Sequence, residues 1–261
     1  MTAPFDPPVR LRDEYRSWRW TLASCWPEQA TWRLDHSDDA SRYVKVYRAG
    51  RYPSLLDEAQ RTKWARTWLP VPEVLDVGTD EQFEWLITRG LPGRPAIELQ
   101  SADPRPVVIA LAEGLRRFHE HAPAEDCPFD FSLSVALPHV ARRVEQGRVD
   151  PAEDFNDDHH DLDLPSALAA LDTLRPSSED LVVCHGDYCP PNILIADGRA
   201  AGFVDLGELG VADRWWDLAV ATWATTWNYG PGLEPLFLAA YGADVDDDRH
   251  SFYRLLYDLA S

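Results

Sequence analysis

The stretch from residue 183 to residue 194 constrains the fold of this chain more than any other part of the sequence. It reads Val-Cys-His-Gly-Asp-Tyr-Cys-Pro-Pro-Asn-Ile-Leu, so a loop that carries Asp187 and Asn192 is enclosed by two apolar, strand-like runs. A third apolar run follows and ends at Asp205, with Gly207 shortly after it. The pattern predicts short strands that present two carboxylates and one amide in adjoining turns.

This set of side chains suits phosphoryl transfer. The reaction needs a carboxylate that orients the acceptor hydroxyl and takes its proton, and it needs Mg²⁺ held by hard oxygen ligands. Protein kinases use Asp-x-x-x-x-Asn for the carboxylate and one metal ligand, and Asp-x-Gly for the other metal ligand. Each motif alone would more often cap a turn, but their order and their apolar flanks favour a kinase-like enzyme.

A kinase-like chain also needs a strand lysine that contacts the phosphates and a helix glutamate that orients it. Only two lysines occur in the sequence, and one of them, Lys45, lies in the alternating run over residues 43–47. The valines on either side of Lys45 would face the opposite side of that strand. Glu58 follows in a predicted helix over residues 55–69. We interpret Lys45 and Glu58 as the required pair.

The chain divides into a β-rich first third and a mostly helical remainder, separated by a Gly-Leu-Pro-Gly hinge that begins at residue 90. The spacing predicts an α+β fold with a nucleotide-binding lobe over residues 1–89 and a catalytic and substrate-binding lobe over residues 90–261. Strands are expected over residues 19–24, 30–35, 42–48, 74–77, 83–88, 181–184, 193–196 and 202–204. Helices are expected, besides residues 55–69, over residues 106–121, 138–146, 164–174, 216–227, 233–241 and 250–259.

Composition excludes several classes of protein. The 261 residues carry a formal net charge of −19, which repels the phosphate backbone and argues against nucleic acid as a partner. No run of about 18 apolar residues could span a membrane, and residues 1–16 lack the apolar core of a secretory signal. The four cysteines lack the spacing of a zinc or disulfide framework. We therefore expect a cytoplasmic protein with reduced thiols.

From about residue 21 onward the chain resembles the aminoglycoside phosphotransferase family, most closely its 3′-phosphotransferases for kanamycin and neomycin. The resemblance implies a protein-kinase-like two-lobed fold, with a small antiparallel sheet in the first lobe and a mainly helical second lobe. The motifs that carry it are His-Gly-Asp at 185–187 through Asn192, Gly-Phe-Val-Asp-Leu-Gly at 202–207, Gly-Val-Ala-Asp-Arg at 210–214, Asp-Leu-Ala at 217–219 and Phe-Tyr-Arg-Leu-Leu at 252–256.

The resemblance also implies roles for the candidate residues. Asp187 would be the catalytic base, while Asn192 and Asp205 would bind Mg²⁺. Lys45 would bind the phosphates of ATP, with GTP as an alternative donor, and Glu58 would orient that lysine. We expect Asp213 and Asp217 to brace the catalytic loop, and His185 to be structural.

Two further segments would contact the nucleotide. The loop over residues 24–31 would cover the phosphates, and because it has no glycine, Ser24 would donate to them instead. The backbone of Ile87, Thr88 and Arg89 would meet the adenine ring.

The substrate implied by the resemblance is a polycation, which carboxylates attract. Residues 150–163 hold seven carboxylates and no Lys or Arg. Glu208 and Trp223 depart from the neomycin type, which has arginine at both positions, so the drug spectrum stays open. The candidate substrate-binding residues are Asp154, Asp157, Asp158, Glu208, Trp223 and Asp258. A metal site formed by residues 157–160 is an alternative, although adjacent loop residues rarely wrap one ion.

Two other functions stay open. One is a small-molecule kinase that acts on a different antibiotic or on a hydroxylated metabolite, because aromatic walls such as Trp223 suit a less charged ligand. The other is a catalytically silent module that binds a nucleotide. The expected partner is a cationic small molecule, with no nucleic acid and no membrane, and the expected assembly is a monomer or a weak dimer.

Overall fold

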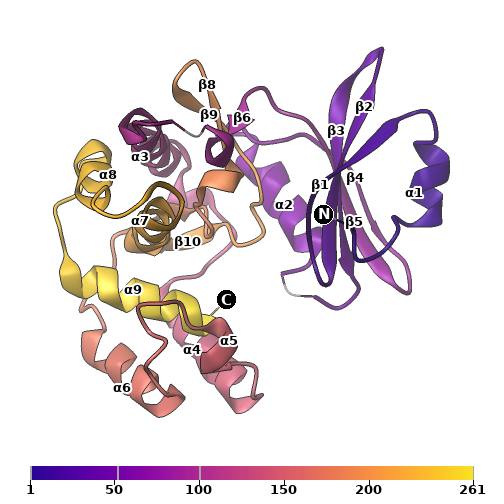
Figure 1. Ribbon diagram of the computed structural model, residues 1–261. Helices are drawn as coiled ribbons and strands as arrows, with labels where there is room; N and C mark the ends of the chain where they lie inside the picture. The colour runs from indigo at the N-terminus through magenta and orange to yellow at the C-terminus, as the bar shows by residue number, and fades with distance from the viewer. Residues whose placement is uncertain (1, 52, 100, 261) are drawn as a thin grey trace. The chain divides into compact units, whose positions relative to one another are not determined.

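A computed structural model describes residues 2–51, 53–99 and 101–260 (Figure 1). Its contacts divide the chain into two compact units, the first reaching Gly93 and including Ala201–Glu208, the second comprising Arg94–Ala200 and the residues from Leu209 on. The sequence prediction placed the boundary after residue 89. The segment Ala201–Glu208 joins the first unit because the Phe203 N–H donates to the Pro70 carbonyl at 3.0 Å and Asp205 pairs with Lys45.

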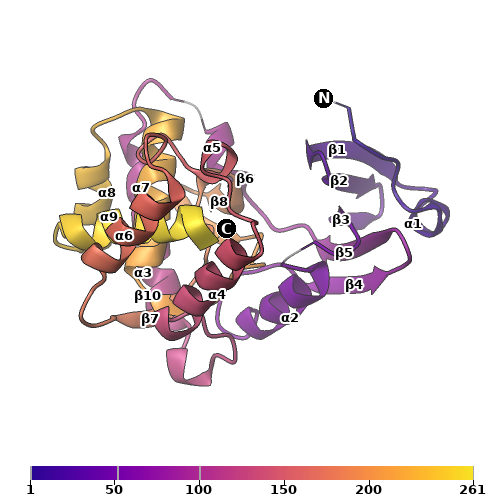
Figure 2. The ribbon, with the colours of Figure 1, turned by 90° about the horizontal axis from the view of Figure 1, so that it is seen from below.

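The first unit is built on an antiparallel sheet with the strand order β1-β2-β3-β5-β4. Two helices, α1 (Val9–Glu14) and α2 (Leu55–Ala65), pack against its opposite faces (Figure 2). The strands are β1 (Arg19–Trp26), β2 (Gln29–His36), β3 (Asp39–Arg48), β4 (Val74–Thr79) and β5 (Phe83–Arg89).

Strand alternation decides which side chain of β3 faces which helix. Val44 and Val46 are fully buried in the cluster that contains residues of α1. Tyr47 packs instead with Leu55 of α2. Because side chains alternate along a strand, Lys45 shares the α2 face with Tyr47. The prediction that the neighbouring valines point away from Lys45 is therefore confirmed.

Helix α2 begins with a capping box. The Ser54 hydroxyl accepts from the Asp57 N–H at 3.1 Å, and the Asp57 carboxylate accepts from the Ser54 N–H at 3.4 Å. The prediction extended this helix to residue 69, but it ends at Ala65, where the Trp68 N–H donates to the Ala65 carbonyl at 2.9 Å and forms a turn. Glu58 lies in the first turn of this helix, on its buried face.

The second unit is mainly helical and centres on α9 (Asp247–Ala260), which packs against α4, α6 and α7 (Figure 1). Helix α8 packs against both α3 and α7. These helices are α3 (Arg105–His121), α4 (Leu133–Glu145), α5 (Pro151–Asp154), α6 (Leu164–Leu174), α7 (Trp215–Tyr229) and α8 (Glu234–Tyr241). No helix in the described part of the chain is long and apolar enough to cross a membrane.

Two small sheets occur outside the five-stranded sheet, and Ala201–Phe203 at the end of β9 belong to the first unit. Strand β7 (Leu181–Cys184) pairs antiparallel with β10 (Gly210–Asp213), and β6 (Arg94–Pro95), β8 (Ile193–Ala196) and β9 (Arg199–Phe203) form the other sheet. The sequence prediction missed β10 because its sequence Gly-Val-Ala-Asp holds mostly residues that are depleted in strands. The helix predicted over residues 138–146 begins earlier, at Leu133, and contains Pro138.

Candidate active site

The loop after β7 carries Asp187 and Asn192 and closes on itself. The Asn192 amide nitrogen donates to the Asp187 carbonyl at 3.0 Å and to an Asp187 carboxylate oxygen at 2.8 Å. These two bonds use both amide hydrogens of Asn192, which turns its carbonyl oxygen away from Asp187. The loop therefore fixes one carboxylate and presents one neutral oxygen that suits a hard cation.

Asp217 of α7 fixes the backbone at the start of this loop. Its fully buried carboxylate accepts from the backbone N–H groups of His185 and Gly186, at 2.7 and 2.9 Å. It also meets the His119 imidazole at 3.0 Å. Because a buried carboxylate persists when it is hydrogen-bonded, Asp217 ties the loop to α7. The predicted bracing role of Asp217 is confirmed, and the buried His185 is structural, as expected.

Asp213 has a different task from the one predicted. Its carboxylate accepts from the N–H groups of Asp180 and Trp215, each at 2.9 Å, and pairs with Arg249. The prediction that Asp213 braces the catalytic loop is wrong, because this carboxylate fixes the approach to β7 and the start of α7.

Sequence reasoning did not single out His119. The residue lies on α3 and its imidazole joins Asp217 to the hydroxyl of Tyr241, at 3.0 and 2.8 Å. A signal was present in the sequence, because His119 follows Leu115 by one helical turn and so continues the apolar face of α3.

In the first unit, Lys45 makes two ion pairs. Its ammonium lies 2.7 Å from a Glu58 carboxylate oxygen and 2.6 Å from an Asp205 carboxylate oxygen. Burial by itself lowers the pKa of Lys45, but the charges of Asp205 and Glu58 outweigh this effect and hold the pKa well above its usual value. Lys45 therefore stays charged. The predicted contact with Glu58 is confirmed, whereas the contact with Asp205 was not foreseen.

The backbone around Asp205 is unusual. Asp205 has a φ of 64°, in the left-handed region that non-glycine residues rarely adopt, and such strain is found mainly at functional sites. Gly207 then allows close packing, since a Cβ there would lie 3.1 Å from Pro53 and 3.8 Å from a Glu58 carboxylate oxygen. The Asp-x-Gly motif thus places its carboxylate beside Lys45 and its glycine beside Glu58.

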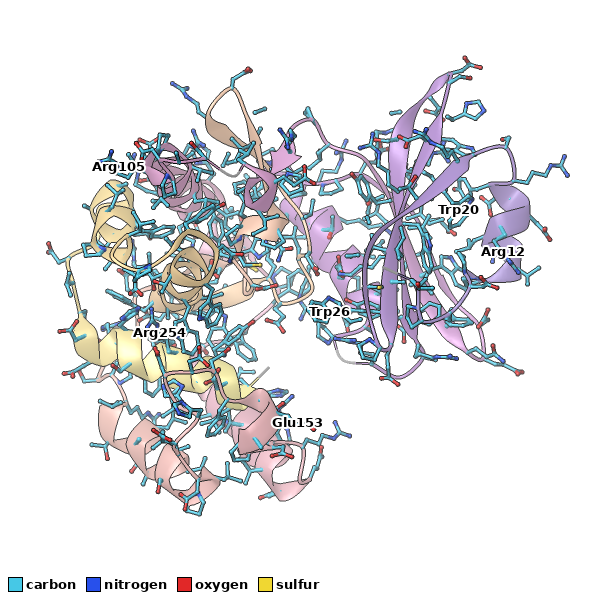
Figure 3. All side chains as sticks on the ribbon, in the orientation of Figure 1. Arg12, Trp20, Trp26, Arg105, Glu153 and Arg254 are labelled. Carbon is cyan, nitrogen blue, oxygen red and sulfur yellow. The ribbon has the colours of Figure 1, made fainter. Side chains whose placement is uncertain are left out.

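Two expectations about nucleotide contacts need correction. Ser24 does not lie in a loop over residues 24–31 but pairs with Thr31 in the β1–β2 hairpin, which turns at residues 27 and 28. Figure 3 labels Trp26 at the end of β1. Ile87, Thr88 and Arg89 lie in β5, and the Arg89 N–H donates to the Glu73 carbonyl at 2.9 Å. That N–H is therefore already used within the unit, and an adenine contact through the other backbone groups of these residues stays a prediction.

Among the substrate candidates, the structure joins Asp158 to Trp223. The Trp223 indole N–H donates to an Asp158 carboxylate oxygen at 2.7 Å, and the Arg254 guanidinium meets that oxygen at 2.7 Å. Arg254 projects from α9 toward α7, where it donates to Thr222 at 3.2 Å (Figure 3). Arg254 was not predicted as a site residue, because it meets Asp158 only where the loop between α5 and α6 contacts α9.

The other substrate candidates are scattered. Asp258 is buried and accepts from the Asn156 N–H at 3.1 Å and from His159 at 2.7 Å. Asp154 accepts from the Asp150 N–H at 2.8 Å, which closes the short helix α5, and Asp157 is exposed. Since His159 bonds to Asp258, the alternative of a metal site over residues 157–160 is not supported. Glu208 is half-buried and belongs to the first unit.

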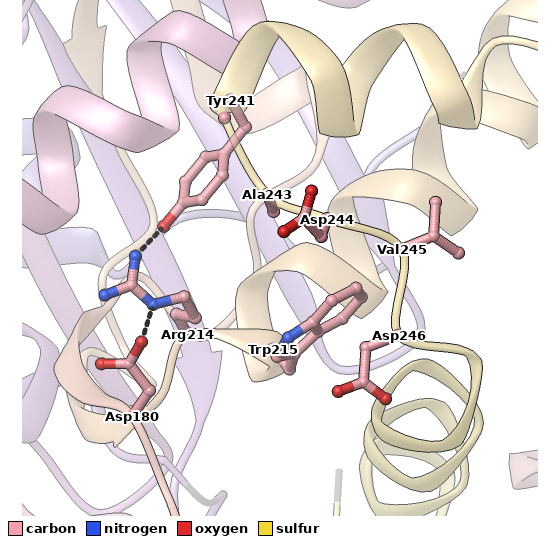
Figure 4. A pocket seen from close by; sticks show the side chains of 9 residues that line it. Asp180, Arg214, Trp215, Tyr241, Ala243, Asp244, Val245 and Asp246 are labelled. Carbon is pink, nitrogen blue, oxygen red and sulfur yellow. Dashed lines mark hydrogen bonds and ion pairs between the residues drawn. The ribbon is translucent and has the colours of Figure 1, made fainter.

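A cavity of about 330 Å³ lies elsewhere in the second unit (Figure 4). Arg214 lies at its wall, held 2.6 Å from Asp180 and 3.2 Å from the Tyr241 hydroxyl. None of the predicted site residues lines this cavity.

Comparison with known proteins gives one consistent result. Residues 28–254 match the phosphotransferase enzyme family. An aminoglycoside 3′-phosphotransferase of Streptomyces fradiae is 42% identical, with 77% of this chain and 78% of the relative covered. A streptomycin 3″-kinase of Streptomyces griseus is 35% identical, with 82% and 83% covered.

Solved structures agree with these relatives. A crystal structure of an aminoglycoside-3′-phosphotransferase of type VIII is 34% identical, with 96% of both chains covered and a TM-score of 0.84. A Streptomyces rimosus aminoglycoside phosphotransferase, solved with ADP and streptomycin, is 30% identical, with 96% of both chains covered and a TM-score of 0.77. The predicted kinase-like fold is confirmed. The chain belongs to the aminoglycoside phosphotransferase family of phosphotransferase enzymes.

Proposed function

We propose that this chain transfers the γ-phosphoryl group of ATP to the 3′-hydroxyl of an aminoglycoside and so inactivates the drug. The observation that carries this proposal is the charged, partly buried Lys45, paired with the buried Glu58 and with the more exposed Asp205. A buried ion pair costs desolvation energy and is weak evidence for stability, so a catalytic use explains it better. The relatives named above supply the substrate class.

Asp187 would act as the base. Its carboxylate would orient the acceptor hydroxyl and take its proton as the phosphoryl group is transferred. The bond from the Asn192 amide at 2.8 Å holds one carboxylate oxygen in place and so orients the carboxylate. The bonds of Asp217 to the preceding backbone limit the motion of the loop, and such positioning supplies most of the rate in phosphoryl transfer.

Lys45 would bind the phosphates. Glu58 and Asp205 hold its ammonium in place and keep it charged, so it can attract a phosphate oxygen. The Asn192 carbonyl oxygen and the Asp205 carboxylate would hold Mg²⁺, since both are the hard oxygen donors that this ion prefers. The ion would supply neutralisation of the phosphate charge. ATP as the donor is consistent with a cytoplasmic enzyme, which we expect to be a monomer or a weak dimer.

A second candidate is transfer to the 3″-hydroxyl of streptomycin. It is favoured by the 35% identity to a streptomycin 3″-kinase and by the internal pairing of the carboxylates Asp158 and Asp258. Carboxylates that are already paired attract a polycation less strongly.

The test is drug-dependent release of ADP from ATP and Mg²⁺, measured with kanamycin, neomycin and streptomycin. We expect release with kanamycin and neomycin, and release with streptomycin alone would favour the second candidate. Asp187→Ala is the negative control, because it removes the base and leaves Lys45 and Glu58 intact. If none of these drugs stimulates ADP release, the proposed function is contradicted.

A further inference from the structure

One large aromatic side chain of the second unit is both exposed and rigidly supported. The Trp227 indole is 50% exposed, whereas Trp223, one helical turn before it on α7, is 3% exposed. The two rings stack with centroids 5.2 Å apart and planes inclined by 23°. One indole is therefore the buried support of another whose surface is open to solvent.

Three neighbours immobilise the supporting ring. The Trp223 N–H donates to Asp158 at 2.7 Å, and the His159 ring meets Trp223 edge-on with centroids 5.6 Å apart. The Arg254 guanidinium lies 5.0 Å from the centroid of the Trp223 ring. Because Trp223 is fixed on these sides, the ring stacked on it is held in one orientation, which lowers the entropy cost of binding a ligand.

Arg254 also changes the charge around this stack. One of its guanidinium nitrogens lies 2.7 Å from Asp158, and another lies 3.0 Å from Glu234 on α8. The carboxylates of Asp158 and Glu234 are thus both paired with the guanidinium of Arg254. Asp157 stays exposed in the same loop as Asp158. The surroundings of Trp227 are therefore less acidic than the carboxylates of residues 150–163 suggest.

We propose that the Trp227 indole is the surface on which an amino-sugar ring of the substrate stacks. The C–H groups on the face of a saccharide ring pack well on an aromatic ring, and an attached ammonium is attracted to its π electrons. Trp223 supports the stacked ring from below. This inference rests on the proposed function for the substrate class, and it makes aromatic stacking, more than carboxylate charge, the basis of drug selection.

The test compares binding and turnover in wild type, Trp227→Ala, Trp227→Phe and Trp68→Ala. Trp68 is the matched control, because it is an exposed tryptophan, 41% accessible, in the first unit. Kanamycin is titrated without nucleotide by calorimetry, and KM and kcat are then measured by ADP release. We expect Trp227→Ala to raise Kd and KM about tenfold and to leave kcat nearly unchanged. Trp227→Phe should recover most of the affinity, and Trp68→Ala should match wild type.

The outcomes separate this inference from the proposed function. If Trp227→Ala binds kanamycin as wild type does, the stacking role is refuted while the proposed function survives. If Trp227→Ala lowers kcat and leaves KM and Kd unchanged, the role is likewise refuted. If wild type binds kanamycin through Trp227 but releases no ADP, the stacking role is supported and the proposed function fails.

Discussion

The contact between Asp217 and the catalytic loop makes a quantitative prediction. Asp217→Ala removes the acceptor for two buried N–H groups, those of His185 and Gly186. A buried donor without a partner costs about 1–3 kcal/mol, so the variant should lose about 2–6 kcal/mol of unfolding free energy. Asp217→Asn keeps one carbonyl oxygen and should lose about half as much. Because the loop that carries Asp187 is freed, kcat should fall about 100-fold.

Asp213 provides the matched control. It is also fully buried and also accepts from two backbone N–H groups, those of Asp180 and Trp215, but it does not touch the catalytic loop. Asp213→Ala should lose a similar unfolding free energy and keep kcat within about threefold of wild type. The assays are urea denaturation and ADP release at a temperature at which every variant is folded. Wild-type kcat in Asp217→Ala, or equal losses of kcat in both alanine variants, would refute the reasoning.

Three further predictions follow from the same contacts. Asp187→Ala should abolish ADP release and retain ATP binding by calorimetry, and residual drug-dependent turnover would exclude Asp187 as the base. Lys45→Met should lower kcat/KM for ATP by about 10²–10³-fold, because a charged donor to the phosphates is lost, and a wild-type value would remove Lys45 from the site. Partial burial raises the pKa of Asp158, but the Trp223 hydrogen bond and the Arg254 charge outweigh this effect and hold that pKa below its usual range. The ionised carboxylate therefore stabilises the fold fully above about pH 4, and this effect is lost as the pH falls below that value. Urea denaturation should show that Asp158→Asn loses less unfolding free energy relative to wild type at pH 3 than at pH 7. An equal deficit at both pH values would contradict this.

The sequence predicted those parts of the site that depend on local spacing. Strand alternation predicted that Lys45 and its neighbouring valines lie on opposite faces of one strand. The structure shows this arrangement, and Glu58 contacts Lys45. The Asp187 and Asn192 spacing likewise predicted one loop, and the two side chains do meet. Short-range patterns suffice here because strand period and loop length fix the geometry.

Contacts between distant elements could not be read from spacing. Asp158 and Arg254 meet only because the loop between α5 and α6 contacts α9, and Lys45 meets Asp205 only because Ala201–Glu208 returns to the first unit. Trp223 shows the consequence for function. Sequence reasoning made it a substrate contact, whereas the structure buries it and exposes Trp227 in its place.

The central claim is that this chain forms a phosphate ester on an aminoglycoside. Phosphorus-31 NMR of a reaction with ATP, Mg²⁺ and kanamycin tests it most directly, with Asp187→Ala as the parallel control. The account predicts a new phosphomonoester signal, coupled to the proton at the 3′ carbon, that grows with ADP and is absent from the Asp187→Ala reaction. An unchanged drug beside intact ATP, or an equal ester signal in both reactions, would contradict it.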